Sequence, residues 1–60
     1  PIIQRGDSVI ITVRKLGFLV EVRGEALDAG AEGESIRVRN LQSRAVIQAV
    51  VVGSGRVEVR

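Results

Sequence analysis

The stretch that most constrains this chain is residues 33–43, Gly-Glu-Ser-Ile-Arg-Val-Arg-Asn-Leu-Gln-Ser. Apolar Ile36 and Val38 alternate there with Arg37 and Arg39. Successive side chains of a β-strand point to opposite faces, so this alternation places the two apolar residues on one face and the two arginines on the other. The stretch therefore predicts a half-buried strand that follows a glycine turn.

Four further segments carry the signals of short strands. The expected strands are residues 8–13, 18–23, 35–40, 45–52 and 56–60. The first two are joined by a short glycine-containing loop, which predicts a β-hairpin with Phe18, Val20 and Val22 on one face. The segment 45–52 is almost continuously apolar, which predicts burial on both of its faces.

Residues 24–33 differ from these strands, because a short run of helix-forming residues lies between glycines. Such a run is too short for a stable helix, so we expect a turn or one short helical turn, with Ala26 and Leu27 against the sheet. The fold class is therefore predicted as all-β: a small barrel or clip of about five short strands in a single domain spanning residues 1–60.

Composition argues against several classes of function. The chain has 60 residues, no Cys and no His, and Phe18 is its single aromatic residue. Candidate nucleophiles without an evident activating base are Ser8, Thr12, Lys15, Ser35, Ser43 and Ser54, so we expect no enzyme activity, and also no metal and no cofactor. No apolar run is long enough to span a membrane. The start at Pro1, without an initiator Met, suggests a fragment of a longer protein.

The order of these motifs resembles the SAF-domain superfamily, and in particular the C-terminal domain of the flagellar basal-body P-ring formation family. The positions that carry the resemblance are Gly6, Asp7, Ala26, Gly33, Ile36, Val38, Asn40 and Ser43, with the closing segment 53–59. The resemblance implies a β-clip fold in a non-enzymatic periplasmic chaperone of a Gram-negative bacterium. Its implied partner is the flagellar P-ring subunit, and it implies an N-terminal domain of the same protein outside this sequence.

A second reading of the same resemblance is an antifreeze-like accessory domain that binds a sugar acid or assists pilus assembly. It ranks lower because the long insertions associated with the antifreeze-like appendage of sialic-acid synthase are missing here. Nucleic-acid binding ranks third. Sites that bind single-stranded nucleic acids depend on exposed aromatic side chains, and this chain has one aromatic residue. Its net charge of +2 is also a weak electrostatic signal for nucleic-acid binding.

Two surfaces are candidates for partner binding. Arg37, Arg39 and Arg44 could form a basic patch, or they could pair across strands with Glu21, Glu34 or Glu58; the residues alone leave both readings open. For Asn40 and Ser43, a structural role in the turn after the strand is favoured. Strand addition is the other possibility. Residues 56–60 or the outer strand of the hairpin are expected at a sheet edge, with client contact through Val57 and Val59.

Overall fold

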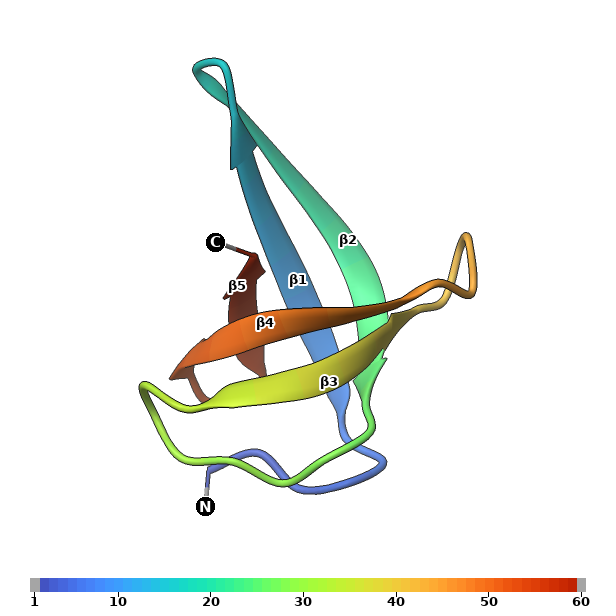
Figure 1. Ribbon diagram of the computed structural model, residues 1–60, viewed down its shortest axis with the longest axis vertical. Helices are drawn as coiled ribbons and strands as arrows, with labels where there is room; N and C mark the ends of the chain where they lie inside the picture. The colour runs from blue at the N-terminus through green and yellow to red at the C-terminus, as the bar shows by residue number, and fades with distance from the viewer. Residues whose placement is uncertain (1, 60) are drawn as a thin grey trace.

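The computed structural model describes residues 2–59 as a closed five-stranded barrel (Figure 1). Its strands are β1 Ser8–Lys15, β2 Phe18–Ala26, β3 Ser35–Asn40, β4 Val46–Gly53 and β5 Arg56–Val59. Neighbouring strands in the order β1-β2-β3-β4-β5 are antiparallel, and a parallel pairing of β5 with β1 closes the barrel. The predicted all-β fold is confirmed. The helical turn is not formed, since residues 27–34 make bends, turns and one β-bridge.

The hairpin of β1 and β2 is longer than predicted at both ends. Its strands pair without interruption from Ser8 opposite Glu25 to Lys15 opposite Phe18, so only two residues form the turn. At the other end, β2 continues through residues 24–26, because these find a second partner in β3. Ala26 thus lies inside a strand, with its side chain buried.

The core fills the inside of the barrel with alternate residues of the strands. Its buried apolar residues are Ile3, Val9, Ile11, Ala26, Ile36, Val38, Ala49, Val51 and Val57. Ile3 precedes the first strand and was not expected in the core. Its N–H donates to the Gly30 carbonyl oxygen at 3.0 Å, and the Gly30 N–H donates to the Ile3 carbonyl oxygen at 2.8 Å. The entry segment and residues 27–34 therefore run side by side and cover one end of the barrel, below the strands in Figure 1.

Two expectations about strand environment are wrong. In β4, Ala49 and Val51 are buried, whereas Val46 is 52 % exposed, so only one face of this strand is fully covered. The reason is that the described residues form a single closed sheet, so no second layer packs against its outer face. β5 is not an edge, because it pairs with both β1 and β4. Val57 is fully buried and Val59 packs against the core, so neither offers the free face expected for client contact.

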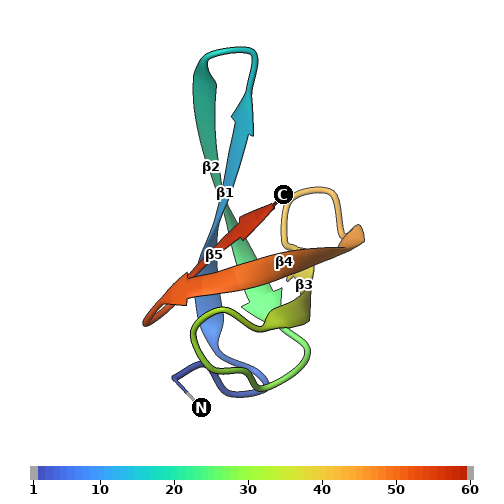
Figure 2. The same ribbon diagram turned by 60° about the vertical axis from the view of Figure 1, so that its left-hand side comes forward.

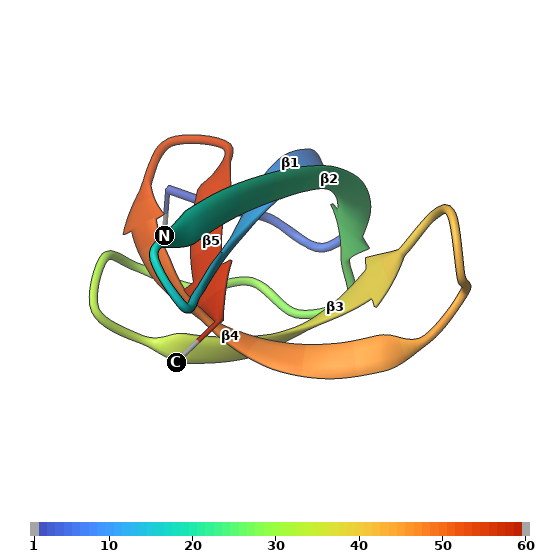
Figure 3. The ribbon, with the colours of Figure 1, turned by 90° about the horizontal axis from the view of Figure 1, so that it is seen from above.

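The outer strand of the hairpin does provide an edge, as predicted. Residues 24–26 of β2 pair with β3, but residues 18–23 have a strand partner only in β1 among the described residues. Beyond Val13, where the pairing of β1 with β5 stops, the hairpin projects away from the barrel (Figure 2). We call residues 14–22 the hairpin arm. Seen from above in Figure 3, the arm lies over β5. Its residues form no strand pairing with β3 or β4.

Candidate functional site

Arg37, the centre of the predicted basic patch, is held by Asp28. Its Nε and Nη2 donate to the two carboxylate oxygens of Asp28 at 2.9 and 2.8 Å, and its main-chain N–H donates to Asp28 Oδ2 at 3.1 Å. The Leu27 N–H donates to the Arg37 carbonyl oxygen at 2.9 Å. A two-pronged guanidinium contact fixes both partners in one geometry. Arg37 therefore fastens the segment after β2 onto β3.

This contact changes the acidity of Asp28. Hydrogen bonds from the side chain and then from the main chain of Arg37 lower the pKa of Asp28 from 3.8 to about 2. A carboxyl whose pKa is lower in the folded protein stabilises the fold above its unfolded pKa, and this contribution is lost as the pH falls from about 3.8 towards 2. The pair is therefore expected to contribute fully to stability at neutral pH, to contribute less as the pH falls below about 3.8, and to contribute nothing once the pH is below about 2.

Arg37→Met is expected to raise the pKa of Asp28 from about 2 towards its ordinary value of 3.8, because the guanidinium donors are removed while the main-chain N–H of residue 37 remains. A carboxyl-carbon NMR titration measures this value. Arg39→Met is the matched control on the same face of β3, and it should leave the pKa of Asp28 near 2. An unchanged Asp28 titration in Arg37→Met would contradict the assignment.

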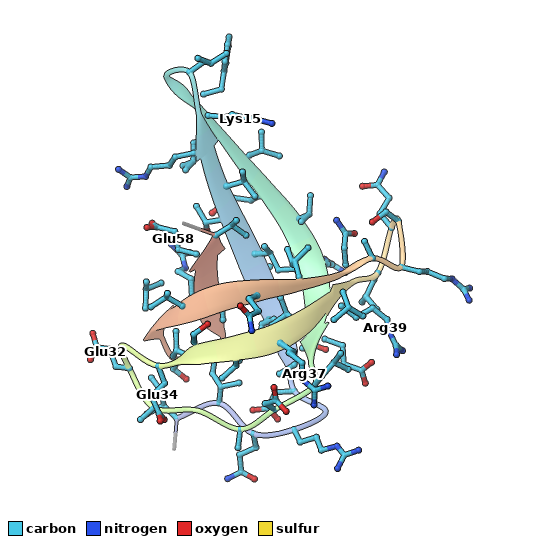
Figure 4. The ribbon with its side chains drawn as sticks, in the orientation of Figure 1. Lys15, Glu32, Glu34, Arg37, Arg39 and Glu58 are labelled. Carbon is cyan, nitrogen blue, oxygen red and sulfur yellow. The ribbon has the colours of Figure 1, made fainter. Side chains whose placement is uncertain are left out.

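The other two arginines do not join Arg37 in a free basic patch. Arg39 lies opposite Glu25 in the register of β2 and β3, with Nη1 at 4.0 Å from the Glu25 carboxylate. Figure 4 shows Arg37 and Arg39 on the same side of the barrel, away from Glu58. Arg44 is exposed in the β3–β4 loop. Structural pairing is thus found for Arg37 and Arg39, but with Asp28 and Glu25 and not with the carboxylates expected from the sequence.

The loop after β3 is organised by its own polar groups. Asn40 Oδ1 accepts hydrogen bonds from the N–H groups of Gln42 at 2.8 Å and Ser43 at 3.2 Å. The Ser43 hydroxyl accepts one from the Ala45 N–H at 3.3 Å. Arg44 adopts φ = 64°, in the left-handed region. Asn40 and Ser43 are therefore used by the turn, which is the role favoured from the sequence.

The remaining motif residues also shape the backbone. The Asp7 N–H donates to the Gln4 carbonyl oxygen at 3.0 Å, and Asp7 Oδ2 accepts from the Gln4 N–H at 2.9 Å, with Gly6 between them at φ = 92°. Gly33 has φ = 90°, and its N–H donates to the Val51 carbonyl oxygen at 2.8 Å. These contacts start β1 and lead the chain into β3.

The feature that sequence reasoning missed is the exposure of apolar side chains on the hairpin arm. Four apolar side chains there are exposed: Leu16 (93 %), Phe18 (72 %), Leu19 (58 %) and Val20 (48 %). Residues 14–19 line a shallow, open hollow at the tip. Phe18 and Val20 had been placed on an apolar face, and they do share a face with Val22, but the barrel ends before it can cover them. The signal available in the sequence was Leu16, an apolar residue in a two-residue turn.

The described range, residues 2–59, offers neither a metal centre nor a membrane-spanning helix. In that range, no group of three or more acidic, His or Cys side chains could hold a metal ion. The same residues contain no helix that is long and apolar enough to cross a membrane.

Comparison with known proteins gives consistent results. A family model described as chaperone for flagella basal body P-ring formation matches residues 1–59. The distal basal body ring component protein of Caulobacter vibrioides is 38 % identical over 58 residues, which cover 97 % of this chain and 22 % of that protein. Crystal structures of Salmonella FlgA in open and closed forms match with TM-scores of 0.86 and 0.87 at 24 % identity, over 97 % of this chain. They support the fold. The chain spans less than a third of the length of each of these proteins.

Proposed function

The chain belongs to the family of chaperones for flagella basal body P-ring formation, and we propose that it serves as a periplasmic module of such a chaperone, assisting assembly of the P-ring around the flagellar rod. The match of the family model to residues 1–59 carries this proposal. The 38 % identity to a basal body ring component protein supports it. The partner is then a component of the P-ring, and the module has no catalytic step to perform.

The surface of the module suits a role in holding another protein. The barrel's own strands cover the core at β5, whereas apolar side chains of the hairpin arm are exposed to solvent. Contiguous apolar surface on a soluble module commonly marks a contact with another protein. The sugar-acid alternative is not favoured, because the family match concerns P-ring formation and two of the three arginines expected to bind an acidic ligand face carboxylates of this chain. Arg37 is bound to Asp28, and Arg39 lies beside Glu25.

The test uses the natural gene product that carries this sequence. Deletion of its gene is expected to leave hook–basal bodies without a P-ring in electron micrographs and to abolish swimming in soft agar. Re-expression of the wild-type gene should restore both, and fractionation should recover the protein with periplasmic markers. Normal numbers of P-rings in the deletion strain would overturn the proposal.

A further inference from the structure

The hairpin arm combines an unpaired sheet edge with an exposed apolar face. Opposite residues of an antiparallel pair share a face, so Val13 and Val20 form one pair on the inner side of the hairpin, with Ile11 and Val22 beneath them. Ile11 is buried in the core, and Val13 and Val22 pack against it. The exposed Phe18 and Val20 thus continue the apolar inner face of the barrel beyond the point where other strands cover it.

The free edge can be assigned to particular main-chain groups. The Arg23 carbonyl oxygen accepts a hydrogen bond from the Leu41 N–H at 3.1 Å, on the side of β2 away from β1. In an antiparallel strand, every second residue directs its N–H and C=O to the same side. The main-chain groups of Glu21 and Leu19 therefore face outwards as well, and no strand pairs with them in the described part of the chain.

The turn of the arm is also locally costly. Leu16 has φ = 50° and Gly17 has φ = 81°, so both turn residues lie in the left-handed region. Asn-Gly is the preferred pair for such a turn, and a leucine there costs about 1–2 kcal/mol in backbone strain. Almost all of the Leu16 side chain is exposed, and the strain brings no packing in return. Leu16 therefore departs both from the residue preference of this turn and from the preference of large apolar side chains for burial. Such local conflicts are typical of functional sites.

Charge indicates the chemistry of the occupant. The arm and its base carry Arg14, Lys15 and Arg23 against Glu21, and in residues 2–59 neither Lys15 nor Arg23 lies within 4.0 Å of a carboxylate. A second copy of this arm carries the same net positive charge, which disfavours pairing of two arms. A lipid surface would accept the apolar tip, but its hydrocarbon region could not satisfy the outward N–H and C=O groups of Leu19 and Glu21. An acidic, partly apolar polypeptide strand matches the free main-chain edge, the exposed apolar face and the positive charge of the arm.

We propose that the free edge of β2 at residues 18–22 binds an extended segment of a partner protein as an additional strand, with apolar residues of that segment on Phe18 and Val20 and acidic residues near Lys15 and Arg23. Main-chain hydrogen bonds to Leu19 and Glu21 supply affinity that does not depend on sequence, and the two side-chain contacts supply selectivity. The choice of a P-ring component as the partner rests on the proposed function. The free edge of β2 follows from the strand pairing alone.

The decisive variant is Glu21→Pro in the natural gene product. Proline removes the outward N–H of residue 21 and leaves the ladder of β2 with β1 intact, and an edge strand with its N–H towards solvent is one of the positions in a sheet where proline is tolerated. It should weaken partner binding by about 10-fold or more, since the ring also blocks the approaching strand. Glu21→Gln keeps the N–H and is the matched control, with binding within about twofold of wild type. A thermal unfolding curve checks that both variants remain folded.

Hydrogen exchange on the wild-type protein gives a second readout that does not depend on a variant. Two probes are used: purified P-ring subunit, and a blocked peptide that alternates valine with acidic residues. Binding should slow exchange of the Leu19 and Glu21 amides by about 10-fold or more, and should not affect the Gln42 amide, which already donates to Asn40. Lys15→Glu combined with Arg23→Glu should weaken binding at low salt, whereas Arg44→Glu should not.

The outcomes separate the two proposals. If the subunit binds while the Leu19 and Glu21 amides stay unprotected, strand addition is wrong and the chaperone function stands. If only the acidic peptide binds and protects these amides, strand addition stands and the P-ring assignment is wrong. Failure of both probes overturns both. Strand addition by a partner protein is also overturned by protection of these amides before any probe is added, by self-association through the edge in place of partner binding, or by binding of the arm to anionic lipid vesicles in place of the peptide.

Discussion

Gly24→Ala is expected to destabilise the barrel by about 3 kcal/mol, the upper end of the usual range for overpacking. A Cβ at Gly24 would clash with Ile11 Cδ1 and lie 2.8 Å from the Arg39 carbonyl oxygen. The side chain of Ile11 could rotate, but the carbonyl belongs to β3 and moves only with the sheet. A domain of this size rarely has more than about 3–5 kcal/mol of stability in total. Urea unfolding followed by circular dichroism should show most of the cooperative transition lost.

Gly53→Ala is the matched control for this prediction. Gly53 is also a strand glycine, at the end of β4, but a Cβ there would meet no atom within 4 Å. Its unfolding free energy should stay within about 0.5 kcal/mol of wild type. If both alanine variants behave alike, the close approach of strands at Gly24 is not what selects glycine there.

Ile11→Ala is expected to destabilise the protein by about 2–5 kcal/mol, because it opens a cavity at the centre of the core. The Ile11 side chain is fully buried and lies against Gly24, which pairs with both β1 and β3. Urea unfolding measures the loss. Leu19→Ala removes a similar volume from the exposed arm and should change the unfolding free energy by at most about 0.5 kcal/mol.

The two substitutions share one contact, so their effects should not add. In the double variant Gly24→Ala with Ile11→Ala, the new methyl group occupies space that Ile11 has vacated, and part of the loss should be recovered. The coupling should be about 1 kcal/mol or more in the favourable direction. Strict additivity would show that the Arg39 carbonyl oxygen alone, and not Ile11, opposes a side chain at residue 24.

Local pattern predicted the elements well wherever a strand is bounded by its own turn residues. The expected range of β3, residues 35–40, agrees with Ser35–Asn40, because Asn40 accepts the hydrogen bonds that end the strand. The end of β2 was missed for the opposite reason. Residues 24–26 have no strand-like composition, and they remain extended because β3 and the entry segment pair with them. The prediction of a single domain that forms part of a longer protein stays a prediction.

The candidate site was predicted less well than the fold. Alternation correctly placed Arg37 and Arg39 together on one face, yet the carboxylate of Asp28 comes from a loop whose path depends on Gly30 and Ile3. The segment that contains Val57 and Val59 was one of the two edges expected from the sequence, and this expectation is wrong because β5 pairs on both sides. The parallel pairing with β1 brings together residues far apart in sequence, which no local pattern reports.

The strands, their turns and the alternation of side chains between the two faces of each strand can be read from the sequence, because they depend on residues close together in the chain. The sequence also carries the family motif over nearly its whole length. Barrel assembly, by contrast, sets which strands have no free edge, which arginines pair with carboxylates and where the apolar inner face is left uncovered. Those features depend on barrel closure, and closure leaves residues 18–22 of β2 as the edge available to a partner.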